Sequence, residues 1–177
     1  MAINYIYGTA PFRAPLLNGS SKAMNVNGAT TPVVFTYSPG GSTPVEIHKI
    51  TCLLKQSSGD NTAFSNFAAL SALANGVLIQ CTIAGNTTTM ATLKDNSDLC
   101  NMFSINQFGS SAVLSILSVV TPQGFGNSTN SFIGAMQFQQ PFLLTGSDTI
   151  TVTIQDNLSS VGLLNMSIAG VILVPGN

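Results

Sequence analysis

Residues 149–155, with the sequence TITVTIQ, alternate strictly between branched apolar and short polar side chains. Successive side chains of a β-strand point to opposite faces of a sheet, so the Ile and Val side chains are expected to face a core and the threonines to face outward. Asp148 and Asp156 stand on either side of this stretch. We interpret both as turn residues whose short carboxylates accept hydrogen bonds from nearby backbone, and not as a catalytic pair.

Similar segments recur along the chain, separated by turn residues such as Pro39-Gly40-Gly41. One short helix is expected within 64–76, where apolar residues recur at helical spacing and Asn75-Gly76 provides a left-handed stop. The strand-like segments are rich in β-branched and aromatic residues. They predict strands over 33–37, 45–56, 76–83, 87–93, 101–108, 111–120, 131–144, 149–155 and 163–174.

This inventory favours an all-β fold, an antiparallel β-sandwich with one short helix. Among sandwiches we prefer a jelly roll, because connections such as 56–76 are too long for a simple series of hairpins. At 177 residues the chain is expected to hold one domain, which we place at residues 24–177. Residues 1–23 are predicted to form an extended N-terminal arm, in which glycines and prolines interrupt any regular element. Whether this arm lies on its own domain or on a neighbour stays open.

Charge is scarce in this chain. Only 11 residues are charged, or 6%, where an ordinary domain has roughly 25%. Net charge is −1, and no cluster of Lys and Arg indicates a nucleic-acid footprint. The longest apolar runs are too short to span a bilayer, and the first residues do not resemble a secretion signal, so the chain is expected to fold where it is made and to act without a membrane. A surface with so few charges suggests a chain packed against other protein.

The residues that could support catalysis are few. His48 is the sole histidine and shares a strand face with Glu46, but no nucleophile lies near it in sequence, so we interpret it as a surface or interface histidine. The cysteines Cys52, Cys81 and Cys100 lie in apolar stretches at wide spacings, which is typical of buried free thiols. One histidine and scattered thiols do not supply a tetrahedral metal site. We therefore expect no enzymatic activity, no cofactor and no metal.

Two polar loops complete the candidates. The segment KDNSDLCN places Asp95 and Asp98 beside Lys94, but it lacks the spacing of a calcium loop and is predicted to form a turn. Residues 121–130 contain Gly-Phe-Gly without the Lys and helix start of a phosphate loop. We interpret this second segment as a loop that exposes Phe125. The chain has no Trp, which weakens a carbohydrate-binding interpretation.

Five segments in a fixed order resemble a group of tailed-bacteriophage virion structural proteins. The first residues of this likeness, MNVNGATTPVVFTY, are similar to an opening that recurs in that group, and the remaining segments are IHKITCLL, FAALSALANGVLI and FLLTGSDTITVTIQDNLSS, closed by IAGVIL. The likeness covers residues 24–173 and leaves the N-terminal arm outside. It consists of fold-forming segments without a catalytic signature. The resemblance implies a jelly-roll capsid decoration or cement protein, which commonly forms a homotrimer on the capsid lattice.

On this basis the expected partner is the major capsid protein, and the expected location is the capsid surface of a virion assembled in the host cytoplasm. Two alternatives stay open: a small single jelly-roll major capsid protein, and a tail-associated receptor-binding or glycan-binding module. The candidate partner interface comprises Tyr5, Tyr7, Phe12 and Leu16 of the arm and Phe125 of the loop.

Overall fold

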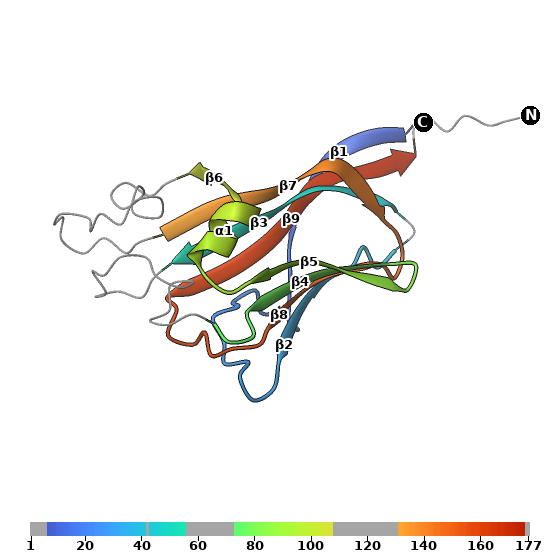
Figure 1. Ribbon diagram of the computed structural model, residues 1–177. Coiled ribbons are helices and arrows are strands. Elements are labelled where there is room, and N and C mark those ends of the chain that lie inside the picture. The colour runs from blue at the N-terminus through green and yellow to red at the C-terminus, as the bar shows by residue number, and fades with distance from the viewer. Residues whose placement is uncertain (1–6, 42, 56–72, 108–130, 176–177) are drawn as a thin grey trace, which may run out of the picture.

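The computed structural model describes residues 7–41, 43–55, 73–107 and 131–175. In these ranges the chain forms two antiparallel sheets packed against each other and a short helix, which is an all-β sandwich (Figure 1). The elements in chain order are β1 (Tyr7–Pro15), β2 (Val33–Tyr37), β3 (Val45–Lys55), β4 (Val77–Ile83), β5 (Asn86–Leu93), α1 (Asn96–Met102), β6 (Ser104–Gln107), β7 (Ser131–Leu144), β8 (Thr149–Ile154) and β9 (Leu163–Pro175).

The strands pair in a nested order. The strand order is β1-β9-β3-β7-β6 in the five-stranded sheet and β2-β8-β4-β5 in the four-stranded sheet. The first strand therefore pairs with the last, β2 pairs with β8, β3 pairs with β7, and β4 pairs with β5. From β1 to β4, each strand lies in the sheet opposite to the one before it, as the two layers in Figure 1 show. The fold thus resembles one long antiparallel hairpin wrapped into two layers.

The predicted strands in the described ranges are largely confirmed. Both β2 and β7 have the predicted bounds, and β8 and β9 begin at the predicted residues. Strict alternation with one buried face is the reason, because β8 shows intermediate and buried residues in turn along its whole length. The predicted strand 111–120 lies outside the described residues. So does most of the predicted helix 64–76, whose last residues, 73–76, are not helical.

The helix α1 forms where the sequence predicted an acidic turn, so that prediction is wrong. Asp95 is the residue before the first helical turn, and its carboxylate accepts a hydrogen bond from the N–H of Asp98 at 3.0 Å. The carboxylate of Asp98 accepts in return from the N–H of Lys94 at 2.7 Å. This exchange resembles a capping box, which satisfies N–H groups that have no partner inside the helix. The helix displaces the start of the predicted strand 101–108, and within the described residues this strand is confirmed as Ser104–Gln107.

The prediction that glycines and prolines exclude a regular element from residues 1–23 is also wrong. Residues 7–15 form β1, which pairs with β9 along its full length at the edge of the five-stranded sheet. The N–H of Leu16 donates to Met166 of β9 at 3.2 Å, so in the alternating ladder the nitrogens of Pro15 and Pro11 point away from β9. A proline costs no hydrogen bond at such an edge position. The described part of the arm therefore lies on its own chain.

The core lies between the two sheets. Ile150, Val152 and Ile154 of β8 are fully buried, and they meet an inner row from β3 that includes Ile47 and Ile50. His48, between Ile47 and Lys49, has no partner in the ladders with β7 and β9, and the register shifts there at a β-bulge. The bulge restores the inward direction of the apolar residues after His48, so the row stays buried to the end of the strand.

We predict that Gly170→Ala destabilises the protein. Gly170 lies opposite Ile47 at the bulge, and a Cβ atom built there would overlap the carbonyl oxygen of Glu46. Backbone cannot yield as a flexible side chain can, so the cost should be about 1–3 kcal/mol of unfolding free energy, as for other overpacked sites. Urea unfolding measures this loss of unfolding free energy. Gly41→Ala is the matched control, since its nearest neighbouring atom lies 4.0 Å from the added Cβ. Equal urea midpoints for both variants would contradict the close approach at Gly170.

Candidate interaction faces

Asp148 has the structural role that the sequence predicted. Its carboxylate accepts hydrogen bonds from the N–H of Thr145 at 2.9 Å and from the hydroxyl of Thr145 at 3.1 Å, which closes the turn before β8. A further bond from the N–H of Ala84, at 2.9 Å, joins this turn to the one between β4 and β5. Ala84 has a φ of 49°, which places it in the left-handed region. Asp148 therefore fixes two turns at one end of the sandwich.

Asp156 has a different role from the one predicted. Its carboxylate does not bond neighbouring backbone but accepts three N–H groups that are distant in sequence, from Ala74 at 3.1 Å, Asn75 at 3.0 Å and Gly76 at 2.6 Å. It thereby holds the residues that lead into β4 against the end of β8. The two carboxylates stand at opposite ends of β8, about 26 Å apart along an extended chain of that length. They cannot act together on one substrate.

We predict that Asp156→Ala lowers the free energy of unfolding by about 1–2 kcal/mol, because three N–H groups lose a charged acceptor and two of these groups can turn to water instead. Urea unfolding gives the difference. Asp156→Asn should recover part of the loss, since its amide oxygen still accepts hydrogen bonds. A urea midpoint for Asp156→Ala equal to that of the wild type would show that these hydrogen bonds make no net contribution to the free energy of unfolding.

The pH dependence of stability should report on Asp148. The N–H of Ala84, followed by that of Thr145, holds the pKa of Asp148 below its ordinary value of 3.8. A carboxyl with a lowered folded pKa stabilises the protein above its unfolded pKa, and this contribution is lost as pH falls below about 4. In urea unfolding, Asp148→Asn should be less stable than wild type at neutral pH, and the difference should shrink in acid. A difference that stays constant with pH would contradict this role.

The other titratable groups form no catalytic arrangement in the described ranges. His48 Nε2 lies 2.7 Å from Glu46 Oε1, and both side chains are substantially exposed, at 43% and 37%. This contact confirms that they share a face, but no described nucleophile bonds to His48. Burial raises the pKa of Cys52 to about 12, and burial followed by the charge of Asp148 raises that of Cys81. Both are free buried thiols, as predicted, and poor nucleophiles at neutral pH.

A metal site is not found among the described residues, where no group of three His, Cys, Asp or Glu side chains could hold an ion. One apolar hollow of about 270 Å³ opens beside Phe142 of β7, near Ile83 and Met90 of the β4–β5 hairpin. Among the described residues that line it, the only titratable side chain is the thiol of Cys81, so this lining can hold an apolar group but offers no general acid or base for chemistry on it.

The outer side of the four-stranded sheet is uniform in its chemistry. We call it the hydroxyl face, because threonines dominate it and none of its outward residues is charged. Some hydroxyls bond within it, such as Thr82 to Thr87 at 2.8 Å, and the amide of Gln80 donates to Thr89 at 3.2 Å. Three rows of paired residues cross this face. In the order β2, β8, β4 and β5, the first row is Val34, Thr153, Leu78 and Thr92, and the second is Thr36, Thr151, Gln80 and Thr89. The third row has no residue from β2 and consists of Thr149, Thr82 and Thr87.

The outer side of the five-stranded sheet has the opposite character. We call it the cationic face, because it carries Arg13, Lys22, Lys49 and Lys55. These are four of the five Lys and Arg residues in the chain, and the fifth is Lys94. Arg13 of β1 and Lys49 of β3 both pair with Ala169 of β9, which lies between them. Their backbones are therefore two strand spacings apart, or about 10 Å. Glu46, engaged with His48, is the only acidic residue on the described part of this face.

Three of the five predicted interface residues can be followed in the structure. Leu16 is fully buried in the core of its own chain, which makes it a core residue and not a surface contact. Phe12 is half-buried, with its ring 5.5 Å from that of Tyr37. Tyr7 begins β1, but its side chain is outside the described part of the structure, as are Tyr5 and Phe125 altogether. Sequence reasoning missed the cationic face, although the period of two in Lys49, Thr51, Leu53 and Lys55 signals it.

Comparison of the chain with protein-family models, with curated proteins and with solved structures finds no match. Among the described residues no helix is long and apolar enough to cross a bilayer. The two outer faces of the sandwich are the described surfaces through which the chain can contact other molecules.

Proposed function

We propose that this chain is a non-enzymatic virion structural protein, a decoration or cement protein that forms a homotrimer, binds the lattice of the major capsid protein and stabilises a bacteriophage head. The observation that carries the proposal is the hydroxyl face. It extends over all four strands of one sheet, and no outward side chain on it is charged.

The cost of desolvation favours a face without charges for a protein contact. Burying an unpaired charge in a protein contact costs several kcal/mol, whereas a hydroxyl that finds a partner can be buried at little cost. Each threonine hydroxyl is both a donor and an acceptor, so the hydroxyl face can make hydrogen bonds to a second copy of this chain without a complementary charge pattern. A surface designed for permanent contact with water would not need to exclude Lys and Glu from four strands.

The fold supports the same proposal. We infer a jelly roll, because the nested pairing of β1 with β9, β2 with β8, β3 with β7 and β4 with β5 is what a long hairpin rolled into two sheets requires. The short strand β6 is an addition at the edge next to β7. Jelly rolls build many viral capsid and lectin domains, and fold alone does not choose between them. The neutral outer sheet favours assembly.

The inventory of reactive groups is in keeping with a structural role. Asp148 and Asp156 are engaged with backbone N–H groups, Asp95 and Asp98 cap a helix, and the described thiols are buried. None of these groups is positioned to exchange a proton with a substrate. The proposed protein needs neither a cofactor nor a metal.

Light scattering over a dilution series tests the proposal. We expect a trimer that resists dilution in the wild-type protein. Thr151→Lys places a charge at the centre of the hydroxyl face and should weaken association by at least about tenfold, or about 1.4 kcal/mol, because a lysine there must be desolvated without a counter-ion. Thr30→Lys is the matched control, since it adds the same charge at an exposed threonine away from both sheets.

The other outcomes each point elsewhere. A monomer at all concentrations would contradict the trimer and favour a binding module, while large closed particles would identify the chain as a capsid protein itself. Equal weakening by Thr30→Lys and Thr151→Lys would show that net charge and not the hydroxyl face governs association. Urea unfolding of both variants verifies that each is folded.

A further inference from the structure

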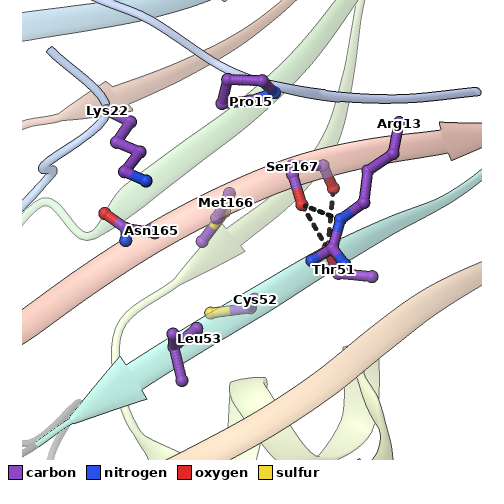
Figure 2. Close-up of a pocket in the computed structure, with 9 residues that line it drawn as sticks. All are labelled: Arg13, Pro15, Lys22, Thr51, Cys52, Leu53, Asn165, Met166 and Ser167. Carbon is purple, nitrogen blue, oxygen red and sulfur yellow. Dashed lines mark hydrogen bonds between the residues drawn. The ribbon is translucent and has the colours of Figure 1, made fainter.

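The cationic face contains a hollow of about 450 Å³ (Figure 2). Thr51 and Leu53 of β3 and Asn165 and Ser167 of β9 form its floor, all on the side of the sheet away from the core. Because most of these side chains are short, they leave space above the sheet. The hollow exists because β1 stops pairing with β9 near Pro15, after which the chain crosses to the other sheet, where Leu17 bonds to Thr36.

Two cations stand on opposite sides of this floor. In Figure 2 the side chain of Arg13 reaches from β1 toward Thr51 and Ser167, while Lys22 lies at the other side, beside Asn165. Neither cation has a carboxylate partner among the described residues. The hollow is therefore a concave polar surface with uncompensated positive charge at two places.

Internal hydrogen bonds orient Arg13. Its Nε donates to the hydroxyl of Ser167 at 3.2 Å, and that hydroxyl lies 2.7 Å from the hydroxyl of Thr51. The Thr51 hydroxyl also donates to the carbonyl of Ser167 at 3.1 Å. With Nε engaged, the terminal nitrogens of Arg13 are left with no partner in the described part of the chain. A guanidinium whose remaining donors are free presents a planar fork that matches a carboxylate.

We propose that this hollow binds an acidic segment of a partner polypeptide, with one carboxylate on the Arg13 fork and another near Lys22. The hydroxyls and the Asn165 amide on the floor can bond the peptide backbone, and Pro15 and Leu53 offer apolar contact. The inference names the chemistry of the partner's contact surface. It goes beyond the proposed function and does not require the partner to be a capsid protein.

The same cations fit a nucleic acid less well. None of the described side chains that line the hollow is aromatic, so they offer bases nothing on which to stack. The chain as a whole carries a charge of −1, so it lacks the long-range attraction that polyanion-binding proteins use. Lys49 and Lys55 widen the positive region along β3 but lie outside the hollow, where they can attract further acidic residues of a peptide.

Fluorescence anisotropy of a fluorescein-labelled hexaglutamate peptide tests the inference. We expect saturable binding that weakens between about 50 and about 300 mM NaCl, because exposed ion pairs are screened over that range. Arg13→Gln and Lys22→Gln should each weaken binding by about tenfold. Lys94→Gln changes net charge equally at a distant site and should leave the affinity unchanged. Lys22→Gln is the second variant in case loss of the Arg13–Ser167 bond disturbs β1, and urea midpoints establish that all three variants are folded.

Three results would overturn the inference. These are no anisotropy change with hexaglutamate, an equal loss of affinity in Lys94→Gln, or binding of a thymidylate oligonucleotide with the same number of charges as tightly as the peptide. A trimeric protein that does not bind hexaglutamate would refute this inference without contradicting the proposed function. A monomer that binds hexaglutamate through Arg13 would do the reverse.

Discussion

The structure depends on burying one side of each sheet in an apolar core while the other side faces outward. Branched aliphatic side chains such as Ile47, Ile150 and Val152 fill the space between the sheets, and burial of their apolar area supplies the main driving force for folding. Nearly all polar side chains are thereby placed on the outer sides or in the turns. The only polar or charged residue counted as buried among the described ones is Asp148, whose carboxylate is fully engaged with backbone and hydroxyl donors. A core of this kind places little constraint on the outer residues, which are then free to serve contact with other molecules.

The two outer sides have diverged in charge although they belong to one small domain. Lysine and arginine gather over the five-stranded sheet, while the four-stranded sheet presents hydroxyls, one amide and two aliphatic side chains. This separation gives the domain a polarity: one side can attract an acidic surface from a distance, and the other can be buried without stranding a charge. A protein that must join copies of itself while holding a different partner has a use for two such sides. The proposed capsid role and the inferred acidic ligand draw on opposite sides and can be tested separately.

Much of the fold was predictable from the sequence, because alternation over six or more residues has no common alternative to a strand with one buried side. Strict alternation predicts β8, whereas the bounds of β2 and β7 follow from runs rich in β-branched or aromatic residues between turn residues. The helix α1 was missed because Asp95 and Asp98 were interpreted as turn residues, when their spacing of three also fits the start of a helix. For β1, the prolines predict interruptions of the strand, and only the pairing with β9 reveals that their nitrogens face the open edge. The partners of Asp156 and the hollow beside Arg13 arise from strands distant in sequence, so no local pattern could have indicated them.

The prolines of β1 have a consequence for how copies of the protein can meet. An exposed edge strand offers a row of N–H and C=O groups that can template another strand, and chains with such edges tend to join into continuous sheets or fibrils. At this edge, alternate residues direct their nitrogens outward, and at Pro11 and Pro15 those nitrogens carry no hydrogen. Backbone pairing with a further strand is therefore interrupted at every second outward position. At this edge, copies must meet through side chains and not through a shared ladder, which disfavours sheets that grow without limit from β1.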